Sequence, residues 1–215
     1  MEEIHVRRGV LWGTDWILGF SGAAKPRLVA PMNETKNQPE NILLIGIMGC
    51  GKSTVGRELH QRLGYPLVDM DQEIERMAGK PITAIFADEG EARFRAMETQ
   101  VLRELAAHPD QRRIISTGGG VIGSGENRRL LRDLGYVVWL DAPLAVILER
   151  TGKSRHRPLL HTEDPAAKIR ELMERRGPLY RETAHLKLDT AGLDSGEIAT
   201  GILECARYFF SQRAQ

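Results

Sequence analysis

The chain has 215 residues, 41% of them hydrophobic and 27% charged, which fits one globular domain with a substantial core and excludes a low-complexity chain. Its formal net charge is +1, so the chain lacks the basic excess that would indicate binding to nucleic acid. It also has no apolar run long enough to span a bilayer. Only two cysteines occur, which argues against a disulfide framework and fits a reducing compartment such as the cytoplasm.

Residues 1–40 differ in composition from the rest of the chain. An apolar stretch at residues 9–20 loosely imitates a secretory signal, but Asp15 interrupts it. Residues 25–40 are polar and contain three prolines, a composition typical of a disordered linker. We therefore expect residues 1–40 to be a disordered extension, or the product of a start codon assigned too early, with Met32 as the true start.

A phosphate-binding motif follows this segment. An apolar run at residues 41–45 predicts a buried strand, and apolar residues at helical spacing predict a helix over residues 55–63. Between them, residues 46–54 fit G-x-x-x-x-G-K-[ST], the P-loop, in which Lys52 reaches the β- and γ-phosphates and the Ser53 hydroxyl ligates Mg²⁺. Inward N–H groups and the helix N-terminus bind the phosphates. The loop residues assigned to ATP binding are Gly49, Cys50, Gly51, Lys52, Ser53 and Thr54.

Strands and helices alternate along the remaining chain. We expect strands at residues 65–71, 112–117, 136–141 and 186–189, and helices over residues 72–105, 128–134, 144–150, 166–176 and 195–210. Residues 79–81 and 88–90 should interrupt the first helical stretch, residues 151–165 should form a long polar loop, and Asp194 or Ser195 should cap the last helix. The alternation predicts an α/β fold with three α/β/α layers around a central five-stranded parallel sheet.

Several further motifs follow one another in a fixed order. They are Val68-Asp69-Met70-Asp71, Gly90-Glu91-Ala92-Arg93-Phe94-Arg95-Ala96-Met97-Glu98, Gly118-Gly119-Gly120, Arg157-Pro158-Leu159-Leu160 and Arg175-Arg176-Gly177-Pro178-Leu179-Tyr180. With the P-loop, their order and spacing resemble the shikimate kinase family, small P-loop kinases related in fold to the nucleoside monophosphate kinases. The resemblance covers roughly residues 41–210. It implies a P-loop kinase domain at residues 41–215, with a substrate-binding helical region and a lid loop.

The resemblance also implies an activity and its partners. The reaction would be ATP-dependent phosphorylation of the 3-hydroxyl of shikimate, giving shikimate 3-phosphate and ADP, in the chorismate route to aromatic amino acids. Mg²⁺ would be the cofactor, and the small molecules ATP and shikimate the partners, with neither nucleic acid nor membrane involved. We further expect a cytoplasmic monomer.

Substrate-binding roles come from the same resemblance. Arg95 and Arg176 match the family's carboxylate-binding arginines. A planar guanidinium suits this role, because it can recognise a carboxylate through two hydrogen bonds. Asp69 and Asp71 would share a face of an extended strand end, with Asp69 near Mg²⁺ and Asp71 as the candidate base on the substrate hydroxyls. Gly118-Gly119-Gly120 matches the run on which the substrate ring lies. The plainer alternatives are solvated helix arginines, solvated strand-end acids and a tight turn.

Nucleotide-side roles are implied in the same way. Arg157 matches the lid arginine that stabilises charge on the transferring phosphoryl group, and the catalytic set is Lys52, Asp71 and Arg157. Arg150 either stacks on adenine, as in the family, or is a cation favoured at a helix end. Residues 190–194 depart from the family because they lack the expected basic residue near adenine.

Cys50 occupies a P-loop position where alanine or serine is expected. A nearby ammonium and helix N-terminus favour a reactive thiolate there. The alternative is a thiol that points away from the loop and packs as a small hydrophobe. Cys205, in an apolar helix, is expected to pack.

Two other functions are compatible with this pattern. A related small-metabolite kinase, such as a gluconate kinase, would share the P-loop, but Arg95, Arg176 and the triple glycine favour shikimate. A non-catalytic ligand-sensing domain on the same scaffold is the second alternative. The presence of Lys52, Asp69, Asp71 and Arg157 argues against it. A kinetic screen of hydroxy acids distinguishes the first alternative, and measured turnover distinguishes the second.

Overall fold

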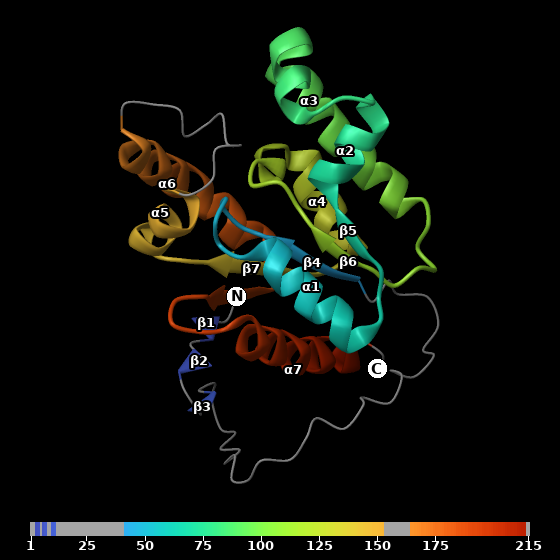
Figure 1. Ribbon diagram of the computed structural model, residues 1–215. Coiled ribbons are helices and arrows are strands. Elements are labelled where there is room, and N and C mark those ends of the chain that lie inside the picture. The colour runs from blue at the N-terminus through green and yellow to red at the C-terminus, as the bar shows by residue number, and fades with distance from the viewer. Residues whose placement is uncertain (1–2, 5, 8–9, 12–40, 153–163, 214–215) are drawn as a thin grey trace.

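The computed structural model describes residues 3–4, 6–7, 10–11, 41–152 and 164–213, which form a sheet with helices on both faces (Figure 1). The five expected strands are present and pair in parallel. The sheet order is β1(Glu3–Ile4)-β8(Leu186–Asp189)-β7(Gly135–Asp141)-β4(Asn41–Ile45)-β6(Ile114–Ser116)-β5(Leu67–Asp69). The α/β/α prediction is confirmed.

The N-terminal segment contributes short strands that the sequence did not predict. The two-residue β1 pairs in parallel with β8, so the sheet has six strands rather than five. β2(Val6–Arg7) and β3(Val10–Leu11) form an antiparallel pair of their own. Residues 12–40, where most of the expected disordered extension falls, lie outside the described residues.

The helices divide between the two faces of the sheet. The helices are α1(Lys52–Leu63), α2(Met70–Ala78), α3(Ile82–Ala106), α4(Gly125–Leu134), α5(Leu144–Gly152), α6(Pro165–Thr183) and α7(Ser195–Arg213), with a 3₁₀ turn η1(Val121–Gly123). One apolar cluster joins the sheet to α1, α5, α6 and α7, and the other joins it to α2, α3, α4 and the end of α6. None of the described helices is both long and apolar enough to cross a membrane.

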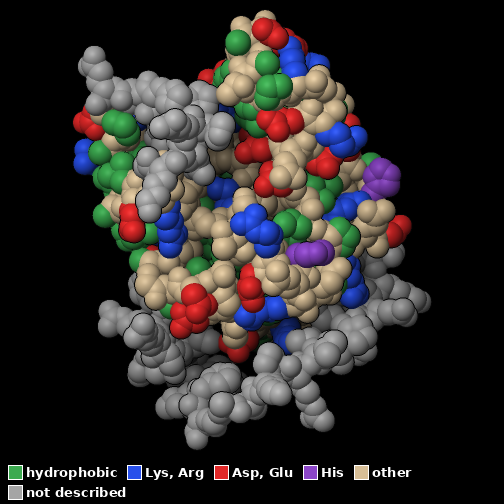
Figure 2. Space-filling view, in the orientation of Figure 1, with side chains coloured by type: hydrophobic (Ala, Val, Ile, Leu, Met, Phe, Trp, Pro, Cys, Tyr) green, Lys and Arg blue, Asp and Glu red, His purple; other side chains and the backbone are tan. Residues whose placement is uncertain are grey.

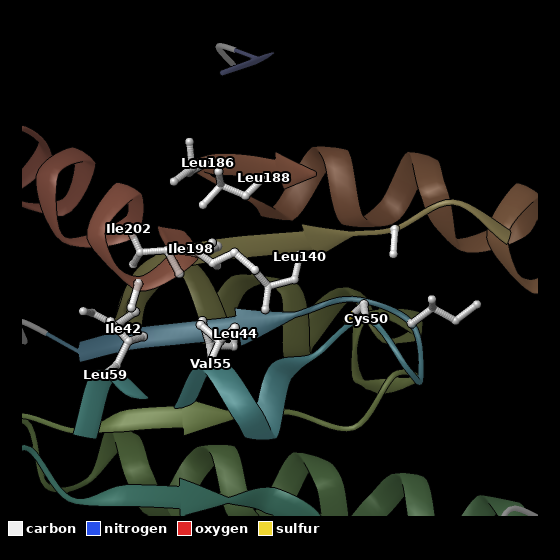
Figure 3. Close-up of a cluster of buried hydrophobic side chains, with 14 of the residues drawn as sticks. Ile42, Leu44, Cys50, Val55, Leu59, Leu140, Leu186, Leu188, Ile198 and Ile202 are labelled. Atoms are coloured by element: carbon white, nitrogen blue, oxygen red, sulfur yellow. The ribbon is translucent and has the colours of Figure 1, made fainter. Parts of the chain in front are cut away.

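The central strand β4 shows how the sequence builds both layers. Ile42 and Leu44 belong to the cluster with α1 and α7, whereas Leu43 and Ile45 belong to the opposite cluster. Alternate side chains of a strand point to opposite faces, so a strand covered on both faces needs a continuous apolar run. Figure 3 shows the first cluster, including Val55 of α1 beneath the strand.

Two boundaries differ from the prediction in ways that matter for the site. β5 ends at Asp69, and Asp71 already lies in the first turn of α2. The two carboxylates therefore do not share the face of an extended strand, because the Asp69 side chain caps α2 by accepting the Asp71 N–H. Helix α6 also continues beyond Arg176 to Thr183 and contains Pro178. The proline removes only one backbone N–H donor from this long, well-packed helix, so the helix is not broken there.

Other predicted breaks are confirmed. α2 ends at Ala78 with Gly79 as its C-cap, and α3 is kinked at Gly90, whose φ of 79° is outside the helical range. Asp194 caps α7: its carboxylate accepts the Glu197 N–H at 2.8 Å, and the Glu197 carboxylate accepts the Asp194 N–H at 2.9 Å. These caps fix where the helices begin at the carboxyl edge of the sheet, where ligand sites of parallel sheets form.

Candidate active site

A cleft of about 960 Å³ lies at the carboxyl ends of the strands. Acidic and basic side chains gather around the hollow on this face of the molecule (Figure 2). The predicted site residues that line it are Gly49, Cys50, Gly51, Lys52, Ser53, Thr54, Asp69, Asp71, Arg95, Gly118, Gly119, Gly120, Arg150 and Arg176. Arg157, the predicted lid arginine, lies outside the described residues. The fold thus brings the P-loop and the other predicted site residues that the structure describes into one cavity.

The P-loop joins β4 to α1 through glycines with positive φ. Gly49 has φ 81° and Gly51 has φ 103°, conformations that favour glycine. The Lys52 ammonium bends back over the loop and donates to Gly46 O at 2.8 Å and to Ile47 O at 3.0 Å. The free N–H groups at the start of α1 and this ammonium together make the loop an anion site.

Cys50 contributes backbone to the loop and its side chain to the core. The residue is fully buried, and it belongs to the apolar cluster that also contains Val55 and Leu140 (Figure 3). A Cβ at Gly46 would lie 2.8 Å from the Cys50 sulfur. The Lys52 ammonium does lie 3.7 Å from Cys50 Sγ, as the reactive-thiolate hypothesis expected, but the full burial of the side chain favours the packing hypothesis.

Ser53 and Asp69, the two residues predicted to bind Mg²⁺, place hard oxygen atoms close together at the P-loop. The Ser53 hydroxyl lies 3.4 Å from Asp69 Oδ2, to which it donates a hydrogen bond. Asp69 Oδ1 accepts the Asp71 N–H at 3.1 Å. No cluster of three or more His, Cys, Asp or Glu side chains that could hold a metal occurs in the described part of the chain. Mg²⁺ needs only one or two protein ligands, because it retains several waters and binds the phosphate oxygens of its substrate.

Arg95, one of the two predicted carboxylate-binding arginines, is held by two glutamates. Its Nη1 lies 2.8 Å from Glu98 Oε2, and its Nη2 lies 2.9 Å from Glu91 Oε1. Glu91 is solvent-exposed, but the Glu98 side chain is only 1% exposed. Glu98 falls within the motif at residues 90–98, but no role was predicted for it. Its spacing of three residues from Arg95 on one helix was the available signal.

Glu98 is a buried acid within a charged cluster. Burial raises the pKa of Glu98, Arg95 lowers it, and the nearby Asp71 raises it again. Glu98 Oε1 has no hydrogen-bond partner among the described residues. A Cβ at Gly118 would lie 3.0 Å from both this oxygen and Asp71 Oδ1. The absence of a side chain at Gly118 therefore leaves room for the two carboxylates.

The other two glycines of the run lie between the arginines. A Cβ at Gly120 would overlap the Arg95 guanidinium, lying 2.6 Å from its Cζ. Gly119 O accepts hydrogen bonds from Arg176 Nη1 at 3.0 Å and from the Tyr180 hydroxyl at 2.6 Å. Arg176 is therefore a buried residue of the cleft, which excludes the solvated-arginine alternative.

Arg150 lies beside the P-loop at the other end of the cleft. Its Nη1 donates to Thr190 Oγ1 at 3.3 Å and lies 3.5 Å from Gly49 O. Leu193 and Ile198 line the same cavity. Thr190, in the segment that lacks the expected basic residue, thus holds Arg150 in place.

The comparisons with known proteins agree with this geometry. The family model described as shikimate kinase matches residues 48–207. The chain belongs to the shikimate kinase family. As a member of this family it is an ATP-dependent phosphotransferase.

Individual relatives and solved structures give the degree of similarity. The chain is 46% identical to the shikimate kinase of Dechloromonas aromatica over 170 residues, covering 79% of this chain and 90% of the relative. The structure is similar to that of a shikimate kinase from Acinetobacter baumannii in complex with shikimate, with a TM-score of 0.75 and 42% identity, covering 82% of this chain and 96% of the other. A shikimate kinase from Aquifex aeolicus matches with a TM-score of 0.64 and 35% identity, over 78% of this chain and 96% of the other.

Proposed function

We propose that this chain transfers the γ-phosphoryl group of ATP to the 3-hydroxyl of shikimate. The observation that carries the proposal is that a single cleft is lined by the P-loop and by the two arginines, Arg95 and Arg176, on either side of the glycine run. A small hydroxylated carboxylate fits this arrangement, because guanidinium groups bind its carboxylate while a hydroxyl lies toward the phosphate site.

On the nucleotide side, the loop N–H groups and the N-terminus of α1 bind phosphate oxygens. Lys52 exchanges its bonds to Gly46 O and Ile47 O for bonds to the β- and γ-phosphates. Ser53 and Asp69 would hold Mg²⁺, which neutralises phosphate charge when bound. Arg150 lies where it can contact the base, and Thr190 fixes its guanidinium.

On the acceptor side, Arg95 and Arg176 bind the carboxylate and Gly118-Gly119-Gly120 lies against the ring. Asp71, at the start of α2, accepts a hydrogen bond from the 3-hydroxyl and orients its oxygen toward the γ-phosphorus. Because phosphoryl transfer depends mainly on positioning and charge neutralisation, this orientation matters more than proton removal. We assign to Arg157 the role of the lid arginine that stabilises the transferring group.

We place this activity in a domain of residues 41–215 that acts as a monomer in the cytoplasm, on the chorismate route. The P-loop and both arginines, Arg95 and Arg176, line one cleft within a single protomer, which supports a site that one copy of the chain can form. ATP is plentiful in the cytoplasm and thiols are reduced there, which fits a chain whose two cysteines are both free.

An assay of ADP release with and without shikimate tests the proposal. Wild-type protein should release ADP in the presence of Mg²⁺ only when shikimate is added, and gluconate should not replace it. Lys52→Ala should remain folded and lose turnover, because the loop then lacks its cation. Shikimate-independent ADP release, or turnover with gluconate equal to that with shikimate, would refute the assignment.

A further inference from the structure

The carbonyl of Gly119 is the acceptor for two side chains of one helix. The Tyr180 hydroxyl donates to Gly119 O over 2.6 Å, and Arg176 Nη1 donates to the same oxygen over 3.0 Å. Arg176 and Tyr180 are four residues apart on α6, so they lie one above the other on one face of the helix. Both lone pairs of this carbonyl are thereby used.

The Tyr180 ring itself has little freedom to move. The residue is 2% exposed, and its ring stacks on Trp139 of β7 with a centroid distance of 5.6 Å and an interplanar angle of 25°. The Lys187 ammonium lies 4.9 Å from the Trp139 ring on the same strand pair. Burial raises the pKa of the Tyr180 hydroxyl, so it remains a protonated donor at neutral pH. The hydroxyl is thus a donor whose position is fixed by the packing of the Tyr180 ring on the sheet.

The peptide that Tyr180 holds separates the two arginines of the cleft. Arg176 contacts its carbonyl at Gly119, and the Arg95 guanidinium covers Gly120. The peptide is trans, so the Gly120 N–H points away from the carbonyl that α6 holds. A Cβ at Gly119 would lie 3.4 Å from both Gly46 O and Met48 N, so the same peptide also packs on the P-loop.

Three consecutive glycines cannot hold this arrangement by themselves. Glycine has the widest choice of backbone conformations, so the orientation of the Gly119–Gly120 peptide must be imposed from outside. Arg176 contributes one bond to the carbonyl but must also leave N–H groups for the substrate. The Tyr180 hydroxyl supplies the second restraint without being consumed by binding.

We propose that Tyr180 is a positioning residue for the acceptor: its hydroxyl fixes the Gly119–Gly120 peptide and thereby sets the spacing of the Arg95 and Arg176 guanidinium groups that receive the carboxylate. This inference rests on the proposed function, because it takes a carboxylate as the group that the two arginines bind. It adds a role for a buried aromatic residue that does not itself contact substrate.

Tyr180→Phe tests this role, because it removes the hydroxyl and keeps the stacked ring. Loss of one hydrogen bond should raise the KM for shikimate about three- to tenfold. The KM for ATP should stay near that of the wild type, and the melting temperature should fall by no more than a few degrees, as expected for one lost hydrogen bond. Tyr136→Phe is the matched control: Tyr136 is also buried, but it lies at the amino end of β7, away from the cleft. It should leave both KM values unchanged.

A double-mutant cycle shows whether Tyr180 acts through the two arginines, Arg95 and Arg176. Arg176→Lys keeps a cation but loses the planar fork, so Tyr180→Phe should change the shikimate KM of this variant by less than about twofold. Fully multiplicative effects would overturn the proposal. An unchanged shikimate KM in Tyr180→Phe, or equal rises in both KM values with a lower melting temperature, would also overturn it. Wild-type protein without shikimate-dependent ADP release would instead refute the proposed function itself.

Discussion

The Ser53 hydroxyl donates a hydrogen bond to Oδ2 of Asp69 over 3.4 Å, joining the first turn of α1 to the end of β5. The second oxygen of Asp69 accepts the N–H of Asp71 and caps α2. One carboxylate therefore has two duties: it starts the helix that carries Asp71, and it faces the P-loop hydroxyl where Mg²⁺ is proposed to bind.

Substitutions at Asp69 should separate these two duties. Asn is as good a helix cap as Asp, so Asp69→Asn should keep the wild-type melting temperature. It loses the ligand charge, and the Mg²⁺ concentration for half-maximal activity should rise about tenfold or more. Asp69→Ala should show the same Mg²⁺ effect and also lose about 1 kcal/mol of stability. An unchanged Mg²⁺ requirement in Asp69→Asn would contradict the metal role.

The parts of the fold that the sequence predicted are those set by local chemistry. The apolar run of β4 and the glycines of the P-loop determine a strand, a turn and a helix within a few residues. Asp71 was misplaced because a strand end and a helix cap look alike in sequence, and the cap bond from Asp69 decided the matter. The two-residue β1 is too short to carry a periodic signal. Its partner β8 also lies at the other end of the chain, so no local pattern predicts the pairing.

The missed parts of the site depend on contacts between distant segments. Tyr180 and Gly119 are 61 residues apart, and no spacing rule relates a tyrosine to a particular glycine carbonyl. Glu98 was visible beside Arg95, but its burial depends on the fold, which places its carboxylate against Gly118 of the glycine run. The motifs thus identified Arg95 and Arg176, and the fold was needed to find the residues that hold them in place.

Gly120→Ala should weaken acceptor binding selectively. The added methyl group would overlap the Arg95 guanidinium, and that flexible end can move, so the protein should fold while Arg95 leaves its place. Displacing a charged partner should raise the shikimate KM roughly tenfold or more, with little change for ATP. Gly123→Ala is the control, since its Cβ would meet nothing within 4 Å. Equal kinetics in the two variants would contradict this account of Gly120.

The cysteines should differ in reactivity in the opposite order to the thiolate hypothesis. Cys50 is fully buried and Cys205 is partly exposed. Iodoacetamide should therefore label Cys205 first in the native protein and Cys50 only after unfolding, as peptide mass spectrometry would show. Cys50→Ala should lose roughly 1–2 kcal/mol of stability through the cavity it leaves, and Cys205→Ala serves as its comparison. Rapid labelling of Cys50 that Mg·ATP prevents would restore the reactive-thiol hypothesis.

Glu98→Gln should change the pH dependence of stability in a defined direction. Burial, offset in part by Arg95, raises the pKa of Glu98 above its ordinary value of 4.5. An acid whose folded-state pKa is raised binds its proton more tightly in the folded protein, so its contribution to stability is complete below pH 4.5 and is lost as the pH rises through the folded-state pKa. The glutamine variant has no proton to lose there. Its free energy of unfolding relative to that of the wild type should therefore increase from pH 4.5 upward and level off above the folded-state pKa. Denaturant unfolding of both proteins across this range measures the difference. A difference that stays flat, or that falls with rising pH, would show that Arg95 outweighs burial and that Glu98 is an ordinary ionised partner.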